Sequence, residues 1–214
     1  MVGKTFGPSN AIDWAAYTEE CERTNAQDQD RILHGAIGMM TEAGEILDIF
    51  KKHIFYGKPV DVVHLKEEIG DFFWYLAIWH HGHSLAQHTE SMLTHFLNSD
   101  NTINLSHGAE IKEFHKLWVV YRLVDVTAQV FVRDARTMIP GWCADDFPHP
   151  HSENPLLSTL VYLMKAFHLE PSEVLEANSA KLRARYPEEG WNKERAENRN
   201  LAAERKVLEN GTEN

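Results

Sequence analysis

The spacing of the apolar residues constrains the fold of this chain more than any other feature. Long stretches repeat apolar side chains every three or four residues, and almost no stretch alternates apolar with polar residues as a half-buried strand would. The stretch 28–53 illustrates the helical period through Leu33, Ile37, Met40, Gly44 and Leu47. The spacing therefore predicts an all-α fold, built as a helical bundle.

Breaks in this period divide the chain into predicted helices. Asp13 suits the N-cap of the first helix, the turn 56–59 ends the second, and Gly82 breaks the third. Pro171 suits the first turn of a later helix. We expect helices at about 14–24, 28–53, 62–81, 85–97, 109–138, 156–168 and 171–186. The charged tail from Lys193 is expected to be partly helical and to fray.

Length and composition favour one folded domain over residues 1–214. With 43% hydrophobic residues, six of them Trp, the chain can bury a core without staples. Its two cysteines, Cys21 and Cys143, form no paired motif, so neither a disulfide framework nor a zinc cluster is predicted, and a reducing cytoplasm fits. The N-terminus lacks a secretory pattern. The longest uncharged apolar run, 72–79, has eight residues, too few for a membrane anchor.

The charge balance excludes one class of partner. Lys and Arg number 21 against 32 Asp and Glu, which gives a formal net charge of −11 with His neutral. Affinity for long nucleic acid comes from many Lys and Arg contacts with phosphates, so long nucleic acid is not expected as the main partner. Small phosphorylated ligands remain, because a divalent metal held by carboxylates can meet their charge.

Two short acidic motifs are the most informative feature for function. Glu42 with Glu45, and Glu68 with Asp71, stand at i and i+3 of predicted helices, so each pair shares a face. Packed together, the two helices would bring four carboxylates to one point. Carboxylates on largely apolar helices need a cation, and Mg²⁺, with Mn²⁺ as the alternative, takes such oxygen ligands. One motif alone would more often lie on a solvated helix face; two motifs on successive, largely apolar helices favour a metal site.

Further side chains could serve a nucleotide beside such a metal. Tyr75 and Trp79 continue the acidic face of the third predicted helix, where a base could stack, although core packing explains them better. A later helix carries an amide and two cations on one face, which can neutralise a triphosphate, although the spacing alone favours a solvated basic face. Its members are Asn178, Lys181 and Arg185.

Two other features have competing interpretations. Lys52 lies two turns beyond Glu45 and either contacts phosphates or pairs with Asp48 at i+4. A histidine cluster ends the third predicted helix and is expected to face solvent rather than to bind a transition metal; it consists of His80, His81 and His83. A di-iron carboxylate bundle would need Glu-x-x-His pairs, and the sequence has none.

The acidic and basic motifs together resemble the MazG-like all-α nucleoside triphosphate pyrophosphohydrolases. The signature of that family is Glu-x-x-Glu, a spacer, and Glu-x-x-Asp, and here 22 residues separate Glu45 from Glu68. The stretches 37–46, 51–53, 65–77 and 176–187 are similar to the bacterial and phage branch. The resemblance covers about 14–80 and 156–200, which leaves a helical insertion at about 84–155.

This resemblance implies hydrolysis between the α and β phosphates of a (d)NTP, giving a monophosphate and pyrophosphate. It implies that the four acidic residues are catalytic and hold Mg²⁺, while the amide and cations of the later helix contact the nucleotide. Family members are dimers or tetramers with active sites between subunits, so a homo-oligomer is expected. Two alternatives remain: the same site acting on another pyrophosphate-containing nucleotide such as an alarmone, or a non-catalytic helical partner protein that binds metal or nucleotide.

Overall fold

The computed structural model describes residues 13–26, 30–83, 154–187 and 190–210, together with residues 91, 122, 124, 125, 127 and 128. All regular structure in these residues is helical, which confirms the predicted all-α fold class for this part of the chain. The predicted helices at 85–97 and 109–138, and most of the insertion, lie outside the described residues. The helices are α1 (Trp14–Thr24), α2 (Arg31–Tyr56), α3 (Val62–Gly82), α6 (Asn154–Ala166), α7 (Pro171–Arg185), α8 (Lys193–Glu197) and α9 (Leu201–Asn210).

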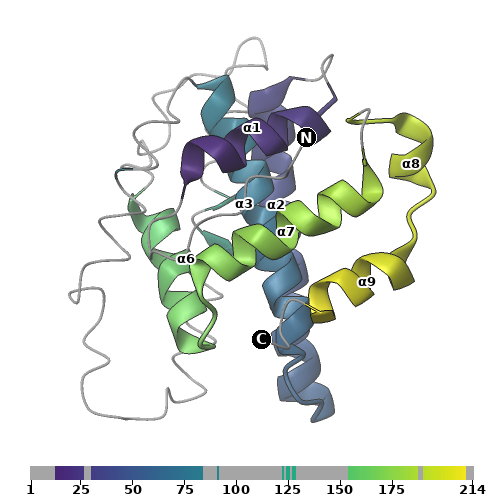
Figure 1. The fold of residues 1–214 in the computed structure, drawn as a ribbon. Helices are drawn as coiled ribbons and strands as arrows, with labels where there is room; N and C mark the ends of the chain where they lie inside the picture. The colour runs from purple at the N-terminus through teal and green to yellow at the C-terminus, as the bar shows by residue number, and fades with distance from the viewer. Residues whose placement is uncertain are drawn as a thin grey trace, which may run out of the picture.

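Helix α3 is the central element of the described fold. It lies beside α2, to which residues 57–61 join it, and it also contacts α1, α7 and α9 (Figure 1). Helix α7 crosses α3 and packs against α9, so the last segment of the chain lies next to the helix pair formed much earlier in the sequence (Figure 1). None of the helices in the described ranges is long and apolar enough to cross a membrane.

Aspartate caps explain where the first three helices begin. Asp13 accepts a hydrogen bond from the Ala16 amide at 2.9 Å, as its predicted capping role requires. Asp30 and Asp61 cap α2 and α3 in the same way, so α2 begins three residues later than predicted. Helix α2 ends at Gly57, whose φ of 63° is the left-handed conformation that glycine adopts most easily.

The buried face of α2 is not the stripe that the period suggests. Ile37, Met40 and Leu47 are 45%, 38% and 38% exposed. Met39 and Ile46, on the adjoining face, are fully buried. Both faces carry apolar residues at helical spacing, so the period predicts a helix without deciding which side packs against α3. The facing core of α3 consists of Leu65, Ile69, Phe72, Phe73 and Leu76.

The histidines at the end of α3 differ from expectation. His80 is fully buried, with ring centroids 6.4 Å from Trp14 and 5.0 Å from Trp79, so the prediction that the cluster faces solvent is wrong for this residue. Trp79 is 1% exposed and belongs to the core, as its core-packing interpretation requires. Only His81 has a side chain about half exposed, at 49%.

The C-terminal segment, residues 190–210, is helical as predicted but is docked rather than frayed. Gly190 has a φ of 72°, and a Cβ there would lie 2.5 Å from the Arg23 carbonyl oxygen. The amide of Trp191 donates to the same oxygen at 3.2 Å. Leu208 is 1% exposed, and Arg205 pairs with Asp61 at 3.2 Å. Contacts at both ends therefore fix this segment against α1, α3 and α7.

Candidate metal and nucleotide site

Three of the four predicted carboxylates meet where α2 packs on α3. Glu42 extends from α2, and Glu68 and Asp71 extend from α3; one oxygen from each lies within 4.8 Å of the others. Glu68 is only 8% exposed. A compact set of carboxylate oxygens is the donor set that hard divalent cations such as Mg²⁺ prefer. These three residues are therefore able to hold a divalent cation, and the choice of Mg²⁺ stays a prediction.

The structure does not bring the fourth predicted carboxylate into this group. Glu45 is exposed on α2, and the residues that meet are the other three. Positions i and i+3 on a helix differ by about 60° in direction, which places Glu42 at the edge facing α3 and Glu45 on the solvent side. The assignment of Glu45 as a ligand stays a prediction.

The electrostatics of the three carboxylates indicate a deficit of positive charge. Burial raises the pKa of Glu42 to about 9, and the hydrogen bond with Glu68 and the charge of Asp71 act in the same direction. Burial likewise raises the pKa of Glu68. The Glu42 and Glu68 pair therefore retains a proton at neutral pH unless a cation neutralises it. A divalent ion would replace that proton.

Helix α7 holds Asp71 from the other side. Lys181 is fully buried and its Nζ contacts both Asp71 oxygens at 2.5 Å, with Glu67 at 3.3 Å. Asn178 donates to Asp71 at 2.7 Å and accepts from the Tyr17 hydroxyl at 2.9 Å. Asn178 and Lys181, predicted to contact the nucleotide, are thus brought to the acidic group, where they orient Asp71. Their contact with a nucleotide stays a prediction.

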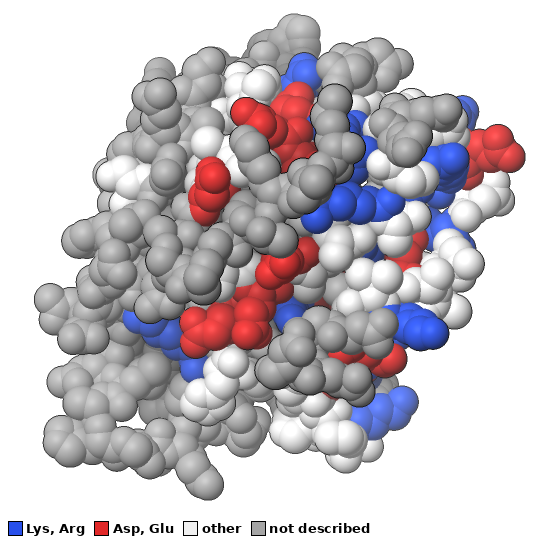
Figure 2. All heavy atoms as spheres, in the orientation of Figure 1, with Lys and Arg blue, Asp and Glu red and all other residues white. Residues whose placement is uncertain are grey.

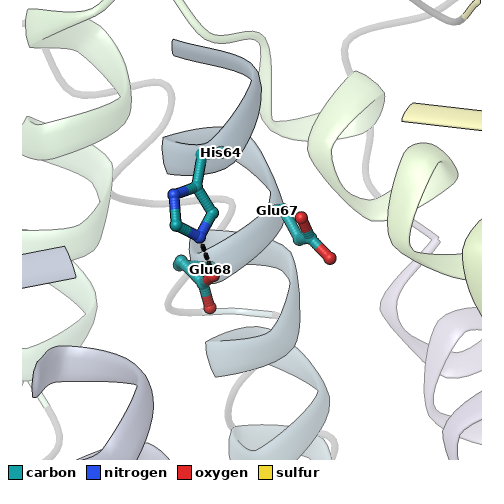
Figure 3. A group of neighbouring side chains, drawn as sticks. All are labelled: His64, Glu67 and Glu68. Atoms are coloured by element: carbon teal, nitrogen blue, oxygen red, sulfur yellow. Dashed lines mark ion pairs between the residues drawn. The ribbon is translucent and has the colours of Figure 1, made fainter. Parts of the chain in front are cut away.

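Another contact near the acidic group was not anticipated from the sequence. His64 lies one turn before Glu68 on α3, and its Nε2 contacts a Glu68 oxygen at 2.6 Å. Figure 3 shows the imidazole directed at Glu68, while the Glu67 carboxylate points away from that pair. These three residues form a second group able to hold a metal, which shares Glu68 with the first. The i, i+4 spacing of His64 and Glu68 is the signal that could have identified the contact.

Glu42 and Asp71 line a cavity of about 570 Å³. Its size is that of an ordinary small-molecule site. Aromatic rings form one wall, in which Trp74 and Tyr75 meet edge to face with centroids 4.9 Å apart. Trp74 donates from Nε1 to Thr24 at 2.9 Å, which fixes the indole. The remaining ring-bearing lining residues are His34, Tyr186 and Trp191.

The other predicted substrate contacts divide into two that line the cavity and one that does not. Tyr75 and Arg185 line it. Burial raises the pKa of Tyr75 to about 12, as do the charges of nearby carboxylates, so its hydroxyl stays protonated and can donate. Lys52 does not line the cavity and instead pairs with Asp48 at 2.7 Å, which is the alternative interpretation of that lysine.

The C-terminal segment supplies part of the cavity wall that sequence reasoning missed. Trp191, Lys193 and Arg199 all line the cavity. In the sequence these residues lie in or just before the charged tail and belong to no motif. Only the weak helical pattern of that region could have pointed to them. Figure 2 shows Asp and Glu gathered near the middle of the drawn face, with many of the Lys and Arg on the side toward α8 and α9.

No protein-family model matches this chain, and no curated protein or solved structure matches it either. The resemblance to the MazG-like family therefore stays a prediction that depends on motifs and their spacing. The features of the structure that bear on function are the acidic group, the cavity and the cations that line it, Arg185, Lys193 and Arg199.

Proposed function

We propose that this protein is a Mg²⁺-dependent nucleoside triphosphate pyrophosphohydrolase, which converts a (d)NTP to a (d)NMP and pyrophosphate. One observation carries the proposal: three buried or half-buried carboxylates meet at the edge of a 570 Å³ cavity that also has aromatic and cationic walls. A metal-bound nucleotide has a cation, phosphates and a base, and each has a matching surface here. The motifs and the 22-residue spacer support the same reaction.

In this proposal Glu42, Glu68 and Asp71 hold the ion. When bound, Mg²⁺ supplies neutralisation of the phosphate charge and activation of the attacking water. Lys181 and Asn178 fix the direction of the Asp71 carboxylate, since both donate to it. His64 fixes Glu68 in the same manner. Because these side chains are already oriented, the reaction does not have to include the cost of arranging them.

The rest of the cavity would position the nucleotide. The rings of Trp74 and Tyr75 offer a surface for the base, and Arg185 offers donors to the phosphates. Water attacks the α phosphorus, the bond from that phosphorus to the oxygen bridging the β phosphate breaks, and pyrophosphate leaves. The proposal places this reaction in the cytoplasm, as expected from the sequence.

We also propose that the protein acts as a homo-oligomer through the exposed face of α2. Ile37, Met40, Leu47 and Phe55 are between 38% and 75% exposed on one helix. Exposed large apolar side chains that share one side of a helix favour an interaction surface. A charged substitution, Leu47→Glu, should shift the sedimentation of the protein to that of a monomer without loss of helix. A wild-type protein that sediments as a monomer at assay concentrations would overturn the oligomer.

Product analysis tests the enzymatic proposal. The protein is incubated with each common NTP and dNTP and with an alarmone, with and without Mg²⁺, and pyrophosphate and orthophosphate are assayed separately. We expect pyrophosphate and monophosphate from some substrates, lost with chelator and lost in Asp71→Asn. Glu19→Gln, an exposed acid on α1, is the control and should retain activity. Nucleotide binding without any product would instead favour a non-catalytic binding protein.

A further inference from the structure

A buried carboxylate in the C-terminal segment connects two arginines of the cavity wall. Glu204 on α9 is 3% exposed. It accepts from Nε of Arg185 at 3.0 Å and from Nη2 of Arg199 at 2.9 Å. Both arginines line the cavity and Glu204 does not. The roles proposed above leave Glu204 and Arg199 unassigned.

Both arginines have N–H groups that do not bond to Glu204. A guanidinium has five N–H donors. Arg185 uses Nε and Nη2 for Glu204, and Arg199 uses Nη2. Among the described residues, Nη1 of each arginine and Nε of Arg199 have no hydrogen-bond partner, so these groups remain able to donate to a ligand in the cavity. Side-chain exposures of 15% for Arg185 and 38% for Arg199 place them at its surface.

The charges of the three groups favour anion binding. Two guanidinium groups against one carboxylate leave one net positive charge. Burial alone would raise the pKa of Glu204, but the hydrogen bonds from Arg185 and Arg199 outweigh burial and hold that pKa below its ordinary value. Glu204 thus stays ionised at neutral pH and keeps both arginines in place. The segment that carries it is itself fixed through Gly190 and Leu208, as described above.

We propose that Glu204 is a positioning residue that holds Arg185 and Arg199 as a paired binding group for the outer phosphates of the nucleotide. This inference rests on the proposed pyrophosphohydrolase function and adds a substrate preference to it. The acidic group and both arginines border one cavity, so a triphosphate whose inner phosphates lie at the metal would direct its outer phosphate toward the arginines. A diphosphate has one phosphate fewer to offer them. The pair therefore favours nucleoside triphosphates over diphosphates.

Neutralising Glu204 would tighten nucleotide binding if the residue acted only through its charge, and would weaken it if the residue positions the arginines. If Glu204 acted only through its negative charge, its neutralisation would make the cavity more positive and tighten the binding of an anionic nucleotide. If it positions the arginines, its neutralisation frees two long side chains whose ordering must then accompany nucleotide binding. Binding then weakens although the cavity has gained positive charge.

The test compares kcat and KM for release of the nucleoside monophosphate, the product common to triphosphate and diphosphate substrates, in Glu204→Gln and Arg199→Gln with those of matched controls. Glu209→Gln is the control for the carboxylate, because Glu209 lies on the same helix and pairs with Arg205 at 2.8 Å. Arg183→Gln is the control for the arginine, because Arg183 does not line the cavity and its exposure of 42% is close to that of Arg199. Helix content, measured by circular dichroism, identifies any variant that has not folded.

We expect KM for the triphosphate to rise about 10-fold in both test variants, the loss typical of a charge-assisted hydrogen bond, with kcat within about threefold of wild type. The ratio of kcat/KM for triphosphate to that for diphosphate should fall, which a general loss of structure would not produce. Both controls should match wild type. An unchanged or lower KM in folded Glu204→Gln, or an unchanged substrate ratio in Arg199→Gln, would overturn the inference while wild-type turnover still supported the enzyme. Absence of wild-type turnover would instead overturn the proposed function itself.

Discussion

Two groups of charged residues at the cavity balance buried charge in opposite ways: an acidic end, formed by Glu42, Glu68 and Asp71, and a basic end, formed by Arg185, Arg199 and Glu204. At the acidic end the carboxylates outnumber their cations, and the pKa of Glu42 is raised to about 9 through burial and its acidic neighbours. At the basic end two arginines surround Glu204, whose pKa is lowered despite burial. One end is therefore short of a cation and the other holds cations ready for an anion. A metal-bound nucleotide presents both at once.

The largest expected effect on activity is at the acidic end. It is measured by comparing one residue from each of the two motifs, which have the same i, i+3 spacing. Glu68→Ala should reduce kcat/KM at least about 100-fold, because it removes one of the three carboxylates proposed to hold the metal. Glu45→Ala should cost less than about 10-fold, because Glu45 is exposed and outside that group. Pyrophosphate release measures both. Equal losses would mean that Glu45 joins the site when substrate or a second subunit is present.

The pH dependence of the free energy of unfolding tests whether the acidic end is short of positive charge. The pKa of Glu42 is raised in the folded protein, from 4.5 to about 9, so the folded protein holds a proton that the unfolded chain has released across this window. Metal-free stability should therefore fall as pH rises from about 5 to 9, by at most about 1.4 kcal/mol for each pH unit. Urea unfolding in chelator measures the slope.

The matched variant is Glu42→Gln, which cannot ionise and should flatten that slope. Saturating Mg²⁺ should also flatten it in the wild type, since the ion replaces the proton. A slope that is the same in Glu42→Gln and in wild type would show that other groups cause it, and would remove the evidence for a charge deficit at this end.

The smallest effect concerns the wall between the two ends. A Cβ at Gly38 would overlap the Tyr75 ring, whereas one at Gly44, on the same helix, would meet nothing within 4 Å. Gly38→Ala should destabilise the fold by about 1–3 kcal/mol and raise KM as the ring moves. Gly44→Ala should stabilise it by up to about 1 kcal/mol. Thermal unfolding compares them; equal effects would contradict the packing of Tyr75 on α2.

The sequence predicted most of the helices because caps and turns mark their ends. Asp13 and Gly57 act as expected, and α7 begins at Pro171. The exposed stripe on α2 could not be predicted, because α2 is apolar on more than one side and only the position of α3 decides which side is buried. Glu45 was grouped with the metal ligands for a similar reason: sharing a helix face within about 60° does not ensure the same distance from a neighbouring helix.

The basic end was the less predictable part of the site. Lys181 and Asn178 were identified, but their contact with Asp71 depends on the crossing of α7 over α3. The sequence gives only a weak sign that Glu204 is buried. Glu204 stands four residues before Leu208, at helical spacing, and both residues are buried in the fold. A buried acid in a charged tail looks like every other acid there until its two arginine partners are known.

Residues 190–210 complete the cavity wall, yet they are synthesised after the helices that carry the carboxylates. The ribosome releases α2 and α3 long before α9, so the carboxylates can meet while the basic wall of the cavity is still unsynthesised. A chain terminated after residue 189 would retain Glu42, Glu68, Asp71 and Lys181 and lack Arg199 and Glu204. On the roles proposed here, such a fragment would keep the metal-binding group but would bind a triphosphate more weakly than the longer chain, because Arg185 would have lost Glu204 and Arg199 would be missing.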